Sequence, residues 1–141
     1  MRLTTQTDYA LRTLMFLATV DRRATAGEVA GLFGISVHHV AKVVHQLARL
    51  GFARSVRGIG GGIELARPPA DISVGEVILA FEGGMQLLDC VVAQEVCSIE
   101  SFCKLKGTLA EAERIQMEYL DSVSLADVIP TKRQLASVSA D

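Results

Sequence analysis

Residues 25–66 read TAGEVAGLFGISVHHVAKVVHQLARLGFARSVRGIGGGIELA, and this stretch decides the fold. It opens with Thr25-Ala-Gly-Glu28, which has the spacing of a capping box and predicts a short helix that stops near Gly34. Ser36 then stands where a cap begins a second helix over about 37–50, with valines on one face and polar side chains on the other. Two short helices joined by a tight glycine turn are typical of a helix-turn-helix.

The glycine-rich stretch after the second helix predicts a β-hairpin. Gly51 ends the helix, and we expect strands over about 52–56 and 63–66. Between them, Arg57-Gly-Ile-Gly-Gly-Gly62 supplies the glycines that permit the positive φ angles of a hairpin turn. A hairpin in this place is a wing, so the predicted fold class is mainly α with a small β-hairpin, a winged helix-turn-helix.

The rest of the chain reads as helices around this unit. We expect a first helix over 7–20, a helix that Ser73 caps and that ends near Glu82, and a long amphipathic helix over about 104–122. The predicted organisation has four parts: a winged helix-turn-helix region over 1–70, a helix and cysteine-containing loop over 71–103, a dimerisation helix and final turn over 104–130, and a flexible tail over 131–141.

Charges are divided unevenly along a chain whose formal net charge is −2. Residues 1–67 carry nine Lys/Arg and four Asp/Glu, whereas residues 68–141 carry five and twelve. The basic half suits a polyanion such as DNA, and phosphates would repel the acidic half. No apolar run reaches the roughly 20 residues that cross a bilayer. The N-terminus also lacks a secretory signal, so we expect a cytoplasmic protein without membrane contact.

Candidate DNA contacts lie on the polar face of the second helix and in the turn of the hairpin. Such a helix enters the major groove, where Gln46 can bond adenine and Lys42 can reach guanine or phosphate. Hairpin glycines let the backbone approach a phosphate or the minor groove closely. The predicted set is Arg2, Ser36, His38, His39, Lys42, Gln46, Arg57, Gly60 and Gly61. The simpler interpretation is a solvated helix face beside a flexible hairpin.

Three cysteines lie in residues 85–103, a connection for which no regular structure is predicted. Their spacing, Cys90-x6-Cys97-x5-Cys103, is neither that of a zinc ribbon nor that of a ferredoxin. By spacing alone, metal binding and unrelated free thiols both stay open. A long connection without structure of its own is usually functional. No histidine follows His45, so a fourth ligand would come from a distant segment, a partner subunit or a small molecule.

Three signatures together resemble a known family. They are MRLTTQTDYALR over residues 1–12, VRGIGGGI over 56–63, and the three cysteines that precede a long helix. Over essentially residues 1–130 the chain is similar to the iron–sulfur winged-helix regulators that include NsrR, IscR and RirA. Within that family it looks most like the NsrR type, the nitric-oxide-sensing repressors.

The resemblance implies a 4Fe–4S cluster, in preference to a 2Fe–2S one, held by Cys90, Cys97 and Cys103. In NsrR-type proteins an aspartate near the start of the first helix, from the other subunit, completes the cluster, and Asp8 has the matching place. Taken alone, Asp8 would be explained by stabilisation of the helix dipole. The resemblance further implies a homodimer on a pseudo-palindromic operator in double-stranded DNA, no enzymatic activity, and release of DNA when nitric oxide nitrosylates the cluster.

Departures from the other types favour this assignment, and competing functions stay open. Lys106 stands where IscR-like proteins have a histidine, Ala41 where their reading helix has a glutamate, and Asp8 where RirA-like proteins have asparagine. An iron- or redox-sensing cluster regulator is the alternative within the family. A cluster- or thiol-based electron carrier or redox enzyme is the alternative of another class, although no nucleotide fingerprint or nucleophile–base pair supports it. A third is a metal-free DNA-binding module with spare cysteines.

Overall fold

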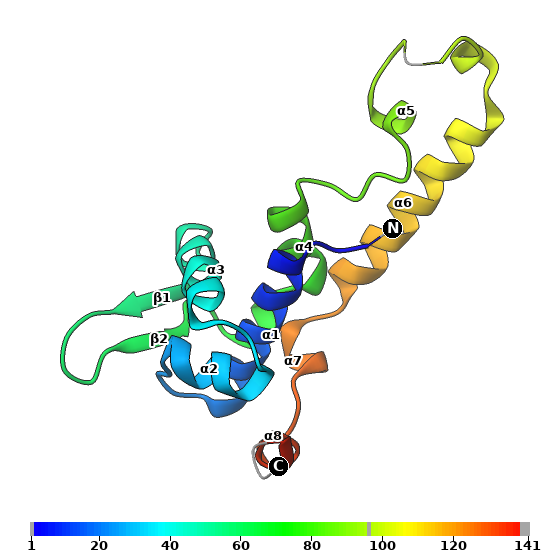
Figure 1. Ribbon diagram of the computed structural model, residues 1–141. Helices are drawn as coiled ribbons and strands as arrows, with labels where there is room; N and C mark the ends of the chain where they lie inside the picture. Colours follow the sequence, from blue (N-terminus) through cyan, green and yellow to red (C-terminus); the bar gives the residue numbers. More distant parts are fainter. Residues whose placement is uncertain (1, 96, 139–141) are drawn as a thin grey trace.

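The computed structural model describes residues 2–95 and 97–138, which form a compact body and a projecting arm (Figure 1). The body contains α1 to α4, the hairpin, α7 and α8, whereas the arm contains α5, η2 and α6. The elements in chain order are α1 (Thr5–Val20), α2 (Ala26–Phe33), α3 (Val37–Arg49), β1 (Ala53–Val56), β2 (Gly62–Leu65), η1 (Pro69–Asp71), α4 (Val74–Glu82), α5 (Asp89–Val92), η2 (Glu100–Phe102), α6 (Lys104–Ser122), α7 (Leu125–Val128) and α8 (Lys132–Val138).

Helix α1 lies at the centre of the body, and its buried side chains hold the neighbouring helices in place. Leu14 and Leu17 of α1 are almost fully buried, as are Val29 of α2 and Val40 and Leu47 of α3. All five belong to one apolar cluster. Burial of each such side chain is worth about 1.5–3 kcal/mol, so this packing fixes the orientation of α3 on the body.

The predicted helix-turn-helix is confirmed, with one difference at the second helix. Glu28 donates from its amide to the Thr25 hydroxyl over 3.1 Å, and the Thr25 amide donates to the Glu28 carboxylate over 2.7 Å, as in the expected capping box. Gly34 ends α2 with a left-handed φ of 62°. Ser36 occupies the N-cap position of α3, but its hydroxyl makes no capping hydrogen bond and the residue stays exposed.

The predicted wing is also present, as a two-stranded antiparallel sheet. The register pairs Ala53 with Leu65 and Val56 with Gly62. The connection between α1 and α2 adds an isolated bridge, because Ala24 and Ile63 exchange backbone hydrogen bonds of 2.9 and 2.7 Å. The hairpin is therefore attached to the body along one edge, and the fold class is the mainly α winged helix-turn-helix that the sequence predicted.

Helix α1 and the C-terminal segment differ from the prediction. Helix α1 begins at Thr5 instead of residue 7, because the Thr4 hydroxyl accepts a hydrogen bond from the Thr7 amide over 3.3 Å and caps the helix. The segment after Pro130, predicted as a flexible tail, contains helix α8. Gln134 and Thr131 cap that helix reciprocally, and Leu135 packs against the core of the body. The end of the predicted tail, 139–141, lies outside the described residues.

The long connection before α6 contains two short helices, α5 and η2, where none was predicted. The predicted long helix is confirmed over Lys104–Ser122. Across residues 2–95 and 97–138, no helix combines the length and the apolar character that a bilayer crossing requires.

Candidate nucleic-acid interface and cysteine segment

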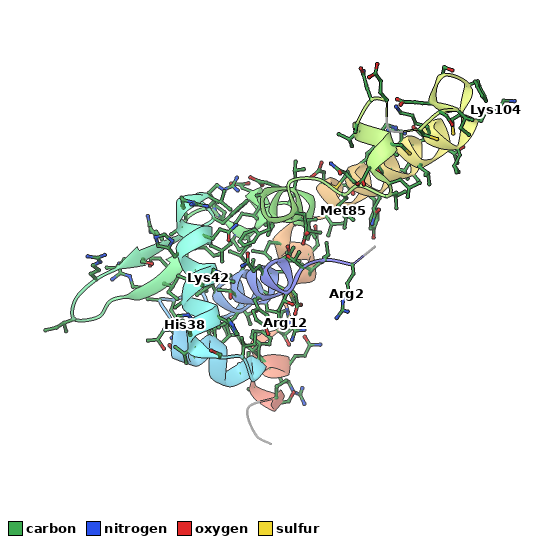
Figure 2. All side chains as sticks on the ribbon, turned by 45° about the horizontal axis from the view of Figure 1, so that its top comes forward. Arg2, Arg12, His38, Lys42, Met85 and Lys104 are labelled. Carbon is green, nitrogen blue, oxygen red and sulfur yellow. The ribbon has the colours of Figure 1, made fainter. Side chains whose placement is uncertain are left out.

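Helix α3 has one apolar and one polar face. Its buried side chains are all apolar and face the body: Val40, Val43, Val44 and Leu47. On the other side His38, His39 and Lys42 are exposed, and Gln46 is partly exposed. Figure 2 shows His38 and Lys42 on this helix, at the surface of the body. The predicted polar residues of α3 therefore share one accessible face.

The turn of the wing depends on two glycines for different reasons. Gly60 has a φ of 73°, a left-handed conformation that disfavours other residues. At Gly61 an added Cβ would lie 2.4 Å from the carbonyl oxygen of Val56, so the close approach of backbone excludes a side chain. Ile59, at the tip, is fully exposed. The predicted glycine pair therefore defines a tight, narrow tip.

The base of the wing is held by an ion-pair network centred on Glu64. Its two carboxylate oxygens accept from Arg23 at 3.0 Å and from Arg54 at 2.7 Å. The hydrogen bonds from Arg54 and Arg23 lower the pKa of Glu64, so its charge persists in mildly acidic solution. Arg23 and Arg54 share this one carboxylate, so the network keeps a net positive charge, and Arg57, which forms no ion pair with any described residue, adds an exposed cation.

A cleft separates α3 from the wing, but of the predicted contacts only Arg57 and Gly61 line it, whereas His39 and Lys42 line a smaller hollow beside Tyr9 of α1. The cleft beside the wing has a volume of about 550 Å³, and its lining also includes His45 of α3. Arg2 is not brought to this cleft, because it lies on the segment before α1, away from His38 and Lys42 (Figure 2).

The three cysteines lie in the arm, at the end remote from α3 (Figure 1). Cys90 is in α5, Cys97 follows it, and Cys103 is the N-cap residue of α6. All three are free thiols, with Cys97 exposed and the other two partly exposed. Among residues 2–95 and 97–138, no three Cys, His, Asp or Glu side chains converge as a metal site would require. Asp8 instead pairs with Arg12 at 2.8 Å.

By donor chemistry, these residues fit an iron–sulfur cluster. Thiolates are the ligands that hold such clusters. All three thiols are free and at least partly exposed, and they lie in the connection before α6 or at its end. Lys106, where a histidine would stand in an IscR-type site, donates instead to Glu100. Because these thiols form no converging group of ligands among the described residues of a single chain, assembly of a metal site would require the connection to close around the metal or a second subunit to contribute.

A hydrogen-bonded clamp joins the start of α1 to the end of α4. The Glu82 carboxylate accepts from the Thr4 amide at 2.7 Å, from the Thr4 hydroxyl at 3.0 Å and from the Thr7 hydroxyl. These hydrogen bonds lower the pKa of Glu82, and the one from Thr7 has the largest effect. No pattern in the sequence predicted this Glu82 clamp. A capping pattern in residues 4–7 could have revealed its threonines, but no local pattern reveals a partner so distant in the chain.

Helix α6 has no buried residue, although parts of its surface are apolar. Three large side chains are more than half exposed: Leu105, Ile115 and Tyr119. Phe102, just before the helix, is 71% exposed. Exposed apolar surface of this kind marks an interaction site in many proteins.

Comparison with known proteins places these features in one family. The Rrf2 family, described as "Iron-dependent Transcriptional regulator", matches residues 3–131. The HTH-type transcriptional regulator NsrR of Geobacillus kaustophilus (strain HTA426) is 37% identical over 141 residues, which cover 98% of this chain and 96% of the relative. The NsrR of Shouchella clausii (strain KSM-K16) is 33% identical, with 98% and 95% covered.

Solved structures show the same fold. The IscR of T. potens has a TM-score of 0.71 and is 27% identical, covering 90% of this chain and 85% of its own. CymR (YrzC), the global cysteine regulator of B. subtilis, has a TM-score of 0.76 over 91% of this chain and 95% of its own. Because CymR is only 23% identical to this chain, its similarity supports the fold alone.

These relatives are transcription regulators, not enzymes, so the electron carrier or redox enzyme considered above is not supported. The helix-turn-helix, the wing and the relatives agree on a DNA-binding regulator. With a match that spans residues 3–131 and relatives above 30% identity over almost the whole chain, this protein belongs to the Rrf2 family of transcriptional regulators.

Proposed function

We propose that this protein is a cytoplasmic, homodimeric repressor that binds a pseudo-palindromic operator and senses nitric oxide through a 4Fe–4S cluster. The observation that carries the DNA-binding part is the exposed polar face of α3 beside an anchored wing. Lys42 on that face and Arg57 on the wing form no ion pair with any described residue, so both charges are available to phosphates.

The residues of the interface have distinct tasks in this proposal. Gln46 reads a base edge, since its amide can bond adenine bidentately. Lys42 reaches guanine or a phosphate, and His38 and His39 extend the same face. The Ser36 hydroxyl, which makes no capping bond, is available as a further donor.

The wing and the N-terminal segment complete the proposed interface. Arg57, Gly60 and Gly61 place a cation and a narrow backbone turn against the minor groove or a phosphate. Arg2 would reach the DNA backbone from the N-terminal segment. The anchoring of the wing by Glu64 and by the Ala24–Ile63 bridge would keep this part in register with α3.

A second copy of the chain is the proposed partner of the arm. The exposed Leu105, Ile115 and Tyr119 would be covered by the same helix of the partner around a two-fold axis. Two recognition helices related in this way contact successive major grooves, which requires a pseudo-palindromic operator. In this view residues 1–70 form the reader, 71–103 the sensor and 104–130 the dimerisation region.

For the sensor we propose Cys90, Cys97 and Cys103 as ligands, with Asp8 of the partner subunit as the fourth. When bound, the cluster supplies iron that reacts with nitric oxide. Carboxylate oxygen is a harder ligand than thiolate, so Asp8 is the ligand most easily exchanged. Arg12 at 2.8 Å offers it an alternative partner, and Asp8 would pass between iron and this arginine.

Helix α1 would connect Asp8 to the reader. On one side Thr7 bonds Glu82, which ends the helix before the cysteine connection. On the other, the Tyr9 ring lies 6.3 Å from the His39 ring of α3, centroid to centroid. A small movement of α1 would thus reach the DNA-contacting face. A coupling of about 1–3 kcal/mol changes affinity roughly 5- to 150-fold.

The test is an anaerobic preparation with and without nitric oxide. Selection from random duplexes should yield a pseudo-palindrome, and nitric oxide should bleach the cluster absorption and weaken binding. Asp8→Ala should uncouple bleaching from DNA release, whereas Asp71→Ala, an exposed aspartate in η1, should behave as wild type. Unchanged cluster binding, nitric oxide response and DNA release in Asp8→Ala would disprove the ligand role.

An iron- or redox-sensing regulator is the second candidate, and the description of the family as iron-dependent favours it. The same preparation separates the two. Release of DNA by an iron chelator or by oxygen, with no effect of nitric oxide, would replace the first proposal by the second.

A further inference from the structure

A cleft of about 840 Å³ lies between α1, α2 and α8, outside both the proposed DNA interface and the cysteine segment. Its size falls within the range of about 300–1,000 Å³ that is typical of small-molecule sites. Six apolar side chains provide much of its wall: Phe16, Val20, Leu32, Leu135, Ala136 and Val138. The cleft therefore joins the first helix of the helix-turn-helix to the C-terminal helix.

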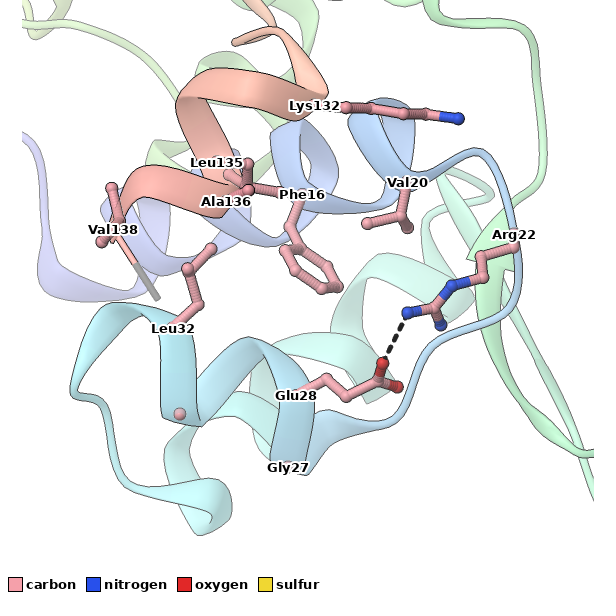
Figure 3. A pocket seen from close by; sticks show the side chains of 11 residues that line it. Phe16, Val20, Arg22, Gly27, Glu28, Leu32, Lys132, Leu135, Ala136 and Val138 are labelled. Atoms are coloured by element: carbon pink, nitrogen blue, oxygen red, sulfur yellow. Dashed lines mark hydrogen bonds and ion pairs between the residues drawn. The ribbon is translucent and has the colours of Figure 1, made fainter. Parts of the chain in front are cut away.

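The charged groups of the cleft gather at one end. Figure 3 shows the Arg22–Glu28 pair on one side and Lys132 above it, beyond Val20, with Leu32 and Val138 on the opposite side. Arg22 and Glu28 neutralise each other in an ion pair of 2.8 Å. Lys132 is exposed and pairs with no acid among residues 2–95 and 97–138. One end is therefore cationic and the other apolar.

The lining of the cleft includes a glycine, Gly31, that is exposed on α2. Gly31 lies inside α2, where glycine favours the helix less than alanine does. Its φ is not positive, and an added Cβ would meet nothing within 4 Å. Gly31 is exposed and lines the cleft, so a larger side chain at this position could be accommodated without a clash and would extend into the cleft.

We propose that this cleft binds an amphipathic organic acid, a carboxylate with an aliphatic body. The carboxylate would lie at Lys132, with Arg22 at the same end, and the hydrocarbon would lie among Phe16, Leu32 and Leu135. Charge complementarity and the division of the wall into two ends favour this class over neutral or cationic molecules. The proposal is independent of DNA binding and of the cluster.

The test uses the full-length protein and isothermal titration calorimetry with octanoate, hexanoate and 1-octanol. Octanoate should bind more tightly than hexanoate by up to about fifteenfold, because each buried methylene contributes about fourfold. It should also bind roughly two- to fivefold more tightly than 1-octanol, which lacks the charge. Lys132→Gln should remove that second difference and leave the affinity for 1-octanol unchanged.

A filled-cleft variant provides the steric control. Gly31→Leu places a side chain in the cleft and should abolish octanoate binding, whereas Gly31→Ala should retain it. Circular dichroism would verify that both fold, and Lys132→Gln carries the test should Gly31→Leu fail to do so. Absence of saturable octanoate binding, equal binding by a folded Gly31→Leu, or equal affinity of the wild type for octanoate and 1-octanol would overturn the proposal.

Discussion

Lys42 and Gln46 lie one turn apart on α3. We expect Lys42 to contribute to the affinity for any DNA sequence and Gln46 to the preference for one base pair. Lys42→Ala should weaken binding to all sequences and reduce the slope of log K against log salt by about 1, because one phosphate contact is lost. Lys104→Ala, at the far end of the arm in Figure 2, is the matched control. Fluorescence anisotropy at several salt concentrations measures both, and an unchanged slope in Lys42→Ala would remove it from the interface.

Gln46→Ala should act differently, by relaxing the preference for one base pair. A bidentate contact to adenine is worth about 1–3 kcal/mol of discrimination. Binding to the selected operator and to a duplex substituted at that position would show the effect. Equal loss of affinity for both duplexes would contradict a reading role and leave only a general contribution to binding.

The Glu82 clamp makes stability depend on pH with a sign that the structure determines. Hydrogen bonds from Thr7 and Thr4 lower the pKa of Glu82 below its ordinary value of 4.5, so the stabilisation is present above that pH. It is lost as the pH falls through the lowered pKa. We therefore expect Glu82→Gln to lower the Tm at pH 7, with a difference from wild type that shrinks in more acidic solution.

Matched threonine variants test the same clamp from the donor side. Thr7→Val removes the donor and should reduce the pH-dependent difference, whereas Thr7→Ser keeps the hydroxyl and should preserve it. Thermal unfolding between pH 7 and pH 3.5 would measure both. If the difference in Tm between wild type and Glu82→Gln stayed constant with pH, the threonine hydrogen bonds would not stabilise the ionised form of Glu82.

At the scale of elements, the position of the wing depends on two features. Its glycines shape the turn, and the ion pairs of Glu64 hold its base. Gly61→Ala should deform the turn, since the new Cβ would lie 2.4 Å from the Val56 carbonyl oxygen. Strain of this kind costs on the order of 1–3 kcal/mol. We expect weaker operator binding with the body still folded, as measured by anisotropy and circular dichroism.

Gly107→Ala in α6 is the control for that substitution. Its Cβ would meet nothing within 4 Å, and alanine favours an exposed helix by about 0.5–1 kcal/mol. It should leave DNA binding unchanged or slightly raise the Tm. Equal operator affinity for Gly61→Ala and wild type would mean that the wing tip makes no contact with DNA.

At the scale of the whole molecule, the arm decides whether two readers are held together. Ile115→Glu would place a charge in the proposed interface, and two-fold symmetry repeats that change in the other subunit. Because burial of each isoleucine is worth about 1.5–3 kcal/mol, the dimer dissociation constant should rise on the order of a hundredfold or more. Analytical ultracentrifugation would show the shift to monomer.

Ala110→Glu offers a control with the same charge on the same helix. At 100° per residue, Ala110 lies roughly opposite Leu105, Ile115 and Tyr119, and it is exposed. This variant should remain dimeric and should bind the operator like wild type. A monomer at micromolar concentration for the unmodified chain would contradict the proposed assembly at once.

Local sequence determined the body of this protein to a large degree. Capping boxes at Thr25 and Ser73, the left-handed Gly34 and the glycine turn of the wing each depend on neighbours within a few residues, and the structure has all of them. The polar face of α3 followed from helical periodicity for the same reason. Short-range chemistry of this kind is legible in the order of the residues because the interacting groups are adjacent in the chain.

Only the tertiary structure determined the contacts between residues that are far apart in the sequence. Glu82 reaches Thr4 and Thr7, and Leu135 brings an expected tail onto the body, where it encloses a cleft. Neither leaves a periodic pattern, because each depends on how separate helices pack. The cysteines show the same limit: their spacing marks a segment, but the distances between thiols depend on how that segment closes, which no local preference determines.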